Sequence, residues 1–237
     1  MTDLLAKLSN GLIVSCRSES DDPFNKPDLI AKFALSAQLG GASAIRAQGI
    51  ENIKAIRELV NLPIIGIIEG RYENDWVCIT PDFKDIDKLI DAGADIVALD
   101  VTPRKRPNGM DGIEFFNDVR NRYDIPLMAD ISTFEEGIRA AEMGSDLIAT
   151  TLSGFTHNTE KFATDEPDFE LIEQLSRGTK IPVVASGRIW NPQQAKEALI
   201  RGAFSVVVGS AITRPRDITK KFVEMMNEKK QTNRVKI

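Results

Sequence analysis

Short runs of apolar residues recur along the chain, and a segment with helical periodicity follows each of them. The runs do not alternate apolar and polar positions, which is typical of parallel strands that are buried on both faces. They predict eight strands, at residues 12–16, 43–46, 64–68, 96–100, 126–130, 147–151, 182–186 and 205–209. The intervening patterns predict eight helices, at residues 27–39, 50–60, 84–91, 111–122, 133–143, 168–177, 191–200 and 218–228.

Two kinds of junction repeat at a long interval. A glycine followed by alanine or serine, which suits the left-handed end of a helix, occurs at Gly41, Gly93, Gly144 and Gly202, in steps of 52, 51 and 58 residues. A proline between apolar residues, which suits the first residue of a strand, occurs at Pro63, Pro126 and Pro182. Two strand–helix units per step predict a single (β/α)8 barrel domain of the TIM type over residues 1–237. An open, doubly wound sheet is the alternative, and the regular period favours the barrel.

The composition excludes several classes of function. A net charge of −5 argues against a nucleic-acid partner, which usually requires a basic face. Cys16 and Cys78 have no metal-binding spacing, and so few cysteines favour a reducing, cytoplasmic setting. Residues 1–7 lack the apolar stretch of a signal peptide, and no run approaches membrane-spanning length. We therefore expect a cytoplasmic protein without a nucleic-acid or membrane partner.

Polar residues stand where the predicted strands end, which in a TIM barrel is the side of the active site. These residues are Ser15, Arg17, Arg46, Glu69, Asp100, Asp130, Thr150, Thr151, Ser186, Arg188, Ser210 and Arg214. Carboxylates and arginines around one mouth predict a small anionic ligand. Glycine turns follow the last two strands at Gly187 and Gly209, and backbone N–H groups in such turns bind phosphate readily.

Several segments carry a resemblance to a known family. They are residues 12–16, 44–47, 63–68, 96–100, 128–130, 150–156 and 208–215, and they match in collinear order over nearly the whole chain. Together they resemble the N-acetylmannosamine-6-phosphate 2-epimerases, and the blocks Thr-Thr-Leu-Ser-Gly and Ile-Thr-Arg-Pro are the most specific. The resemblance implies a ribulose-phosphate-binding type of barrel and a cofactor-independent, homodimeric enzyme of bacterial sialic acid breakdown. Such an enzyme inverts C2 of a 6-phosphorylated N-acetylhexosamine by removing and returning the C2 proton.

Three positions depart from the family pattern. The family usually has its proton-transfer lysine where this chain has Glu69. It usually has glutamate at the position of Ser186, and commonly glutamine at the position of Arg17. Lysine, glutamate and glutamine carry no net charge together, and neither do Glu69, Ser186 and Arg17, which favours a coordinated rearrangement. A glutamate can remove a proton next to a carbonyl when its surroundings suit that task.

The expected mechanism assigns roles to these residues. Glu69 removes the proton next to the open-chain carbonyl of the sugar, while Arg46 and Asp130 position the sugar and polarise its oxygen. Return of the proton to the other face requires a second acid, which could be Asp130, the substrate's own hydroxyl or water. The expected substrate contacts are Arg17, Asp100, Thr150, Thr151 and Ser186. The expected phosphate site consists of Gly187, Arg188, Gly209, Ser210 and Arg214. No cofactor and no metal are expected, and the substrate is the family's phosphosugar or a related one.

Two alternatives remain open from the sequence. A phosphosugar lyase of this fold commonly uses a Schiff-base lysine or a metal, but no lysine stands at a strand end. Carboxylates at Glu69, Asp100 and Asp130 could bind a divalent metal, although His157 is the chain's one histidine. A sugar-phosphate-binding protein without catalysis is the second alternative, because it would keep the phosphate site and lose the proton-transfer lysine.

Overall fold

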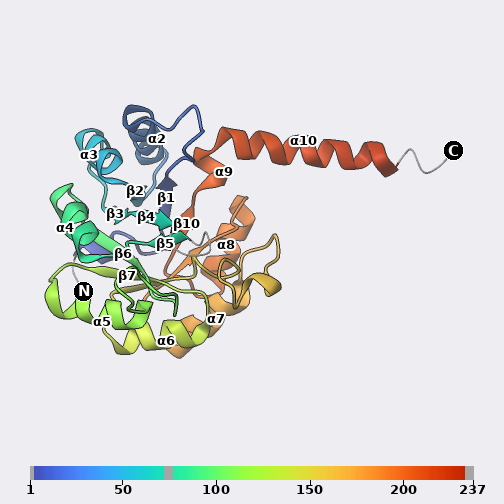
Figure 1. Ribbon diagram of the computed structural model, residues 1–237. Helices are drawn as coiled ribbons and strands as arrows, with labels where there is room; N and C mark the ends of the chain where they lie inside the picture. Colours follow the sequence, from blue (N-terminus) through green and yellow to red (C-terminus); the bar gives the residue numbers. More distant parts are fainter. Residues whose placement is uncertain (1–2, 72–76, 233–237) are drawn as a thin grey trace.

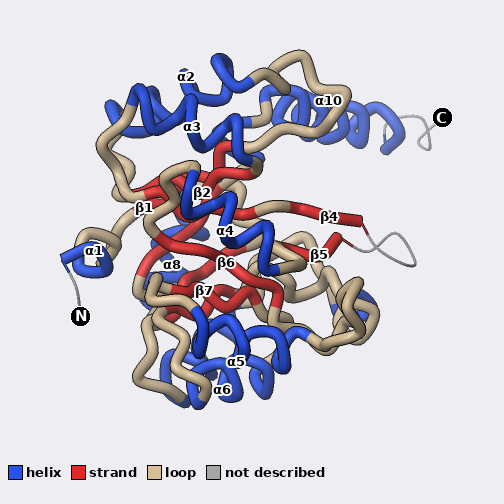
Figure 2. Tube along the Cα trace, turned by 60° about the vertical axis from the view of Figure 1, so that its left-hand side comes forward, coloured by secondary structure: helices blue, strands red, loops and turns tan. Residues whose placement is uncertain are grey.

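The computed structural model describes residues 3–71 and 77–232, and its centre is a closed barrel of eight parallel strands (Figures 1 and 2). The strands follow one another around the barrel in the order β1-β10-β9-β8-β7-β6-β3-β2. Their bounds are β1 Leu12–Cys16, β2 Ala44–Gln48, β3 Ile64–Ile67, β6 Ile96–Asp100, β7 Leu127–Asp130, β8 Leu147–Ala149, β9 Val183–Ser186 and β10 Ser205–Val208. The prediction of a TIM barrel is confirmed, and the open-sheet alternative is wrong.

Helices connect consecutive barrel strands and surround the barrel (Figure 2). Their bounds are α2 Pro27–Leu39, α3 Ile50–Leu59, α4 Phe83–Asp91, α5 Gly112–Arg122, α6 Phe134–Glu142, α7 Phe169–Gly178 and α8 Pro192–Ile200. Several begin at caps that the sequence makes recognisable, because Asp111 and Thr133 each form a capping box and the Asn191 side chain accepts a hydrogen bond from the backbone of Gln194.

The repeated glycines end helices as predicted. Gly41, Gly93, Gly144 and Gly202 have φ values of 92°, 98°, 81° and 97°, a left-handed conformation that other residues rarely adopt. Each one reverses the chain between a helix and the next barrel strand. The approximately 50-residue period of the sequence is therefore the period of two strand–helix units.

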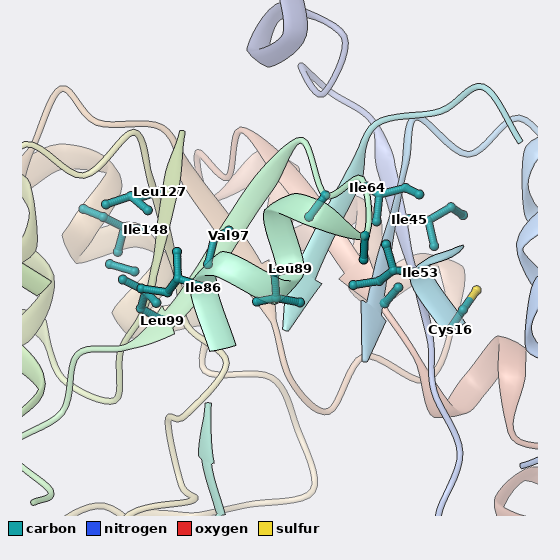
Figure 3. Packing of buried hydrophobic residues seen from close by; sticks show 14 of the residues in the cluster. Cys16, Ile45, Ile53, Ile64, Ile86, Leu89, Val97, Leu99, Leu127 and Ile148 are labelled. Carbon is teal, nitrogen blue, oxygen red and sulfur yellow. The ribbon is translucent and has the colours of Figure 1, made fainter. Parts of the chain in front are cut away.

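Apolar residues of the strands are buried on both sides of the barrel wall. Ile64 packs into an outer layer with helix residues such as Ile53 and Leu89 (Figure 3), whereas its neighbour Ile65 packs inside the barrel with Met128. Leu5 of the short helix α1 (Asp3–Ala6) joins the inner layer. This two-sided burial explains why the strands read as continuous apolar runs.

The structure differs from the sequence prediction in the segment after β3. That strand ends at Ile67, and a small antiparallel hairpin follows, formed by β4 (Glu69–Arg71) and β5 (Val77–Ile79). Glu69 is therefore the first residue of the hairpin, which lies at the carboxyl end of the barrel (Figure 2). Antiparallel pairing between residues that are six to ten positions apart in the chain is not revealed by apolar periodicity.

The end of the chain also departs from a regular barrel. A short helix α9 (Ser210–Thr213) follows β10, and α10 (Pro215–Thr232) begins before the predicted residue 218 and projects away from the barrel (Figure 1). Its side chains Phe222, Met225 and Met226 are 68%, 63% and 67% exposed. Within residues 3–71 and 77–232, no helix combines the length and apolarity needed to cross a membrane.

Candidate active site

A cavity of about 260 Å³ opens at the carboxyl ends of the barrel strands. Ten of the thirteen predicted site residues line it, namely Arg17, Arg46, Glu69, Thr151, Ser186, Gly187, Arg188, Gly209, Ser210 and Arg214. The other three, Asp100, Asp130 and Thr150, are buried beside it without lining it. The cavity is small and rich in polar groups, which suits a compact anionic ligand.

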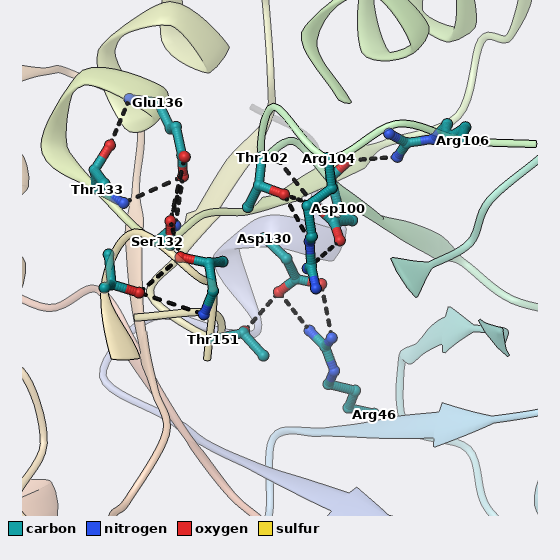
Figure 4. A network of polar contacts seen from close by, with 12 residues as sticks. Arg46, Asp100, Thr102, Arg104, Arg106, Asp130, Ser132, Thr133, Glu136 and Thr151 are labelled. Atoms are coloured by element: carbon teal, nitrogen blue, oxygen red, sulfur yellow. Dashed lines mark hydrogen bonds and ion pairs between the residues drawn. The ribbon is translucent and has the colours of Figure 1, made fainter. Parts of the chain in front are cut away.

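Arg46 and Asp130 form a buried ion pair across the inside of the barrel (Figure 4). Arg46 Nη1 donates to Asp130 Oδ1 at 3.0 Å and Nη2 donates to Oδ2 at 2.7 Å, while Thr151 Oγ1 donates to Oδ1 at 2.5 Å. The two charged side chains are only 4% and 0% exposed. This fork-to-fork geometry orients the guanidinium of Arg46, which borders the cavity, and leaves Asp130 behind it.

Arg17 and Glu69 form a second ion pair, at the mouth of the cavity. Arg17 follows β1, Glu69 begins the hairpin, and Arg17 Nη1 donates to Glu69 Oε1. These side chains are 34% and 19% exposed. Burial lowers the pKa of the Arg17 guanidinium, as do the neighbouring charges of Arg214 and Arg46, while Glu69 raises it. Arginine nevertheless stays charged at neutral pH because its ordinary pKa is so high.

The turns after β9 and β10 bring backbone to the cavity wall. Gly187 has φ +107° and Arg188 has φ +57°, so two successive residues adopt left-handed conformations there. At Gly209 an added Cβ would lie 3.3 Å from Cβ of Ser15, so glycine allows the two strand ends to approach. Arg214 lies beside this turn and pairs with Glu19 at 2.8 Å. The arrangement is of the kind that binds phosphate in TIM barrels.

The side chain of Arg188 supports a loop. Its Nε donates to the carbonyl of Glu166 at 2.8 Å and its Nη1 donates to the carbonyl of Ser153 at 2.5 Å. These two carbonyls lie near the two ends of the segment between β8 and α7. Arg188 thereby holds that segment closed and keeps Phe155 on the cavity wall.

The buried side chains of Thr150 and Asp100 fix the ends of their strands beside the cavity. Thr150 Oγ1 accepts from the backbone N–H of Ser186 at 3.0 Å and donates to its carbonyl at 3.0 Å, which joins β8 to β9. Asp100 accepts from the backbone and hydroxyl of Thr102 at 2.9 and 2.7 Å and pairs with Arg104 (Figure 4). Both side chains are oriented by hydrogen bonds to other protein groups and do not themselves line the cavity.

Comparisons with known proteins show which family the chain belongs to. The NanE family model, described as "Putative N-acetylmannosamine-6-phosphate epimerase", matches residues 30–228. A relative named for the same 2-epimerase activity, from Caldanaerobacter subterraneus subsp. tengcongensis, is 49% identical over 98% of this chain and 97% of its own length. The chain belongs to this epimerase family.

Two proteins of Clostridium perfringens agree with the assignment. One relative named for the epimerase activity is 45% identical over 94% of this chain and all of its own length. The solved N-acetylmannosamine-6-phosphate 2-epimerase of that organism is 44% identical, superimposes with a TM-score of 0.87, and covers 94% of this chain and 96% of its own. The resemblance predicted from the sequence is confirmed.

The three positions at which the resemblance predicts other residues lie in one place. Arg17, Glu69 and Ser186 come from β1, the hairpin and β9, and all three line the cavity. Among the described residues on its wall, Glu69 is the sole carboxylate, and none is a lysine or a histidine. The charge rearrangement inferred from the sequence therefore concerns a single site.

The described residues around the cavity offer little support for a metal site or for a cysteine nucleophile. Among residues 3–71 and 77–232, no three His, Cys, Asp or Glu side chains are grouped so that they could hold a metal ion. Burial raises the pKa of the Cys16 thiol to about 12, so this residue, which packs in the outer hydrophobic layer, remains protonated and is a poor nucleophile.

Sequence reasoning missed the apolar part of the wall. Ile67, Ile79 and Phe155 line the cavity, and none of them was predicted there. Ile79 arrives through the hairpin, and Phe155 through the loop that Arg188 holds. The one available signal was the position of Phe155 inside the specific block at residues 150–156.

Proposed function

We propose that the protein interconverts N-acetylmannosamine 6-phosphate and N-acetylglucosamine 6-phosphate without a cofactor, by removing and returning the proton on C2. Membership of the 2-epimerase family supports this reaction. The observation that carries it is the place of Glu69, the carboxylate on the described cavity wall, beside the turns suited to phosphate. A carboxylate in that position can serve as the base that the reaction requires.

The phosphate of the sugar binds at the turns after β9 and β10. Backbone N–H groups of Gly187, Arg188, Gly209 and Ser210 face this ligand, and Arg214 adds a positive charge. The support is the left-handed backbone at Gly187 and Arg188 together with the close approach of Gly209 to Ser15, where an added Cβ would lie 3.3 Å from Cβ of Ser15. Phosphate held at this end anchors the sugar so that its reacting carbons lie within the cavity.

The reacting end of the open-chain sugar lies against Glu69 and Arg46. Glu69 takes the proton from C2, next to the carbonyl carbon, and a second acid, a hydroxyl of the sugar or water, returns a proton to the opposite face of C2. Arg46, oriented by Asp130 and Thr151, positions the sugar through hydrogen bonds at the cavity wall. Thr151 and Ser186 complete the polar contacts, and Asp100 and Thr150 act from behind by fixing the strand ends.

We also propose that the protein works in the cytoplasm as a homodimer, one barrel per chain. The exposed apolar residues Phe222, Met225 and Met226 on the projecting helix α10 support self-association, since water contact with such a group is unfavourable. Sedimentation analysis of the protein and of a Phe222→Glu, Met226→Glu variant tests this. A dimer that the double substitution dissociates is expected, and a monomer in both samples would contradict it.

Proton NMR in heavy water tests the proposed reaction. Purified protein is incubated with N-acetylmannosamine 6-phosphate, and with other hexose phosphates in parallel. Deuterium entering C2 together with appearance of the C2 epimer is the expected result, and Glu69→Gln lowers its rate by about 100- to 10,000-fold. The matched control is Glu51→Gln, which alters an exposed glutamate on α3 and leaves the exchange unchanged.

Other outcomes of that experiment have distinct meanings. Exchange in a different sugar alone would keep the proton-transfer chemistry and reject this substrate. Fragments of the sugar would indicate a lyase. Binding of every sugar without exchange in any of them would reject catalysis and leave a sugar-phosphate-binding protein.

A further inference from the structure

Arg17 differs from the other arginines of the cavity in how its guanidinium is used. Arg46 gives two N–H groups to Asp130 and is 4% exposed, and Arg188 holds the carbonyls of Ser153 and Glu166. Arg214 pairs with Glu19 and is 11% exposed. These three guanidinium groups are oriented by protein acceptors.

The guanidinium of Arg17 keeps donors for a ligand. It gives one hydrogen bond, from Nη1 to Oε1 of Glu69, while a guanidinium carries five N–H groups. Within residues 3–71 and 77–232 the group has no second hydrogen-bond acceptor, and 34% of the side chain is exposed at the cavity mouth. A ligand oxygen beside Glu69 would therefore meet unused N–H donors.

The hydrogen bond from Arg17 leaves Glu69 able to accept a proton. Arg17 occupies Oε1, and the second oxygen, Oε2, has no hydrogen-bond donor among the described residues. The base and a positively charged donor thus lie side by side, joined by one hydrogen bond. A sugar whose C2 proton faces Oε2 brings its neighbouring carbonyl oxygen toward the guanidinium, because C1 and C2 are directly bonded.

Charged groups surround the guanidinium of Arg17 on several sides. Arg46 and Arg214 lie close enough to act on its charge, and the carboxylates of Glu69 and Glu19 oppose them. An oxygen that becomes negative during the reaction is stabilised most by donors already in place around it.

We propose that Arg17 is a catalytic residue that binds the carbonyl oxygen of the open-chain sugar and stabilises the enolate formed when Glu69 removes the C2 proton. This assignment rests on the proposed function and changes the sequence-based role of Arg17 from a substrate contact to the electrophile of the reaction. In the step, the C2–H bond breaks and its proton joins Glu69. The electron pair of that bond forms the C1–C2 double bond, and the carbonyl pair moves onto O1, where Arg17 holds it.

The three substitutions in the cavity then have one explanation. The resemblance places a cation at position 69 and a neutral glutamine at position 17. Here the cation stands at 17 and the base at 69, so the cavity retains one cation beside one proton-transfer group. Ser186 brings no charge, which agrees with a site whose acid–base and electrophilic groups both lie on the side of β1 and the hairpin.

Rates of C2 deuterium exchange and of epimer formation in Arg17→Gln, Arg17→Lys and Arg17→Ala test the proposal. Arg17→Gln is expected to lower kcat by about 100- to 1,000-fold, as loss of an oxyanion donor does, with KM changed only a few-fold. Arg17→Lys keeps the charge without the fork and is expected to fall between that variant and the unsubstituted protein. Free guanidinium ion restores part of the activity of Arg17→Ala, whereas sodium chloride at the same ionic strength does not.

Matched controls separate catalysis from folding. Arg201→Gln removes an equally large, ion-paired arginine before β10, away from the cavity, and leaves kcat unchanged. Thermal unfolding of each Arg17 variant within a few degrees of the unsubstituted protein confirms that the barrel is intact. If one Arg17 variant unfolds, the kcat values of the variants that stay folded decide whether Arg17 is catalytic.

Three outcomes would overturn the assignment. An Arg17→Gln protein with a kcat within threefold of the original shows that Arg17 does not stabilise the enolate. A rise in KM with unchanged kcat returns Arg17 to a substrate contact. In either case exchange in the unsubstituted protein leaves the proposed function standing, whereas absence of exchange there removes the function and this assignment together.

Discussion

Arg46–Asp130 and Arg17–Glu69 are both arginine–carboxylate pairs at the carboxyl end of the barrel, yet one is sealed inside and the other lies at the mouth. The inner pair is at most 4% exposed, is bidentate, and has Thr151 as a third member. The outer pair is 34% and 19% exposed and shares a single hydrogen bond. The inner pair has little freedom to rearrange, whereas the outer pair keeps N–H groups and a carboxylate oxygen without protein partners among the described residues. The same residue types therefore form a fully hydrogen-bonded pair in one place and a partly bonded pair in the other.

The largest expected effect is a loss of stability when the inner ion pair, Arg46–Asp130, is broken. Asp130→Ala removes the partner of a buried guanidinium and is expected to destabilise the fold by about 3–5 kcal/mol, because a buried charge without a partner is costly. Chemical denaturation measures this loss. The double variant Arg46→Met, Asp130→Leu recovers stability without activity, and failure to recover would mean that packing rather than charge causes the loss.

Glu69→Gln tests the opposite behaviour in the outer pair. The exchange of the C2 proton is expected to fall by about 100- to 10,000-fold, the usual contribution of a general base. The free energy of unfolding changes by less than about 1 kcal/mol, since a partly exposed pair contributes little. Comparable losses of activity and stability would show that the outer pair is also structural.

Arg188→Ala tests the loop that borders the outer pair. Loss of the two hydrogen bonds to Ser153 and Glu166 is expected to raise KM by about tenfold, equivalent to about 1.4 kcal/mol, and to speed proteolytic cleavage between β8 and α7. Gly154→Ala provides an independent check, because its Cβ would lie 2.5 Å from Arg188 Nη1 and the residue has φ +78°. Equal cleavage rates in all three proteins would contradict the role of Arg188.

The smallest expected effect concerns Glu136, a buried carboxylate that accepts hydrogen bonds from Ser132 and Thr133 (Figure 4). Burial raises the pKa of Glu136 above its ordinary value, and the hydrogen bonds oppose this only in part. The folded state therefore holds this proton more tightly, so its contribution to stability falls as pH rises from the unfolded pKa through the raised folded pKa. Glu136→Gln is expected to lose this pH dependence, which denaturation at several pH values between 4 and 7 measures. An unchanged slope would contradict it.

Local patterns determined most of the fold. Continuous apolar runs, capping residues such as Asp111 and Thr133, and the glycines with left-handed backbone act within a few residues, so they predict strands, helices and their order. The period of these signals then implied a barrel, because eight parallel strands joined by helices bury their faces on both sides when the sheet closes. The same order predicted that most of the candidate site residues lie at one end of the barrel, where ten of them line the cavity.

Only the tertiary structure decided which of those residues meet. Arg17 and Glu69 are separated by 52 positions and Arg46 and Asp130 by 84, and their pairing depends on barrel closure and on a hairpin that the sequence pattern did not predict. The direction of α10 and the withdrawal of Asp100 and Thr150 behind the cavity wall also depend on contacts between distant segments. The sequence determined the kinds of chemical groups and their end of the barrel. Long-range packing decided that Asp130 is buried with three hydrogen bonds and that Glu69 is partly exposed with one, because burial and hydrogen-bond partners are properties of the folded chain.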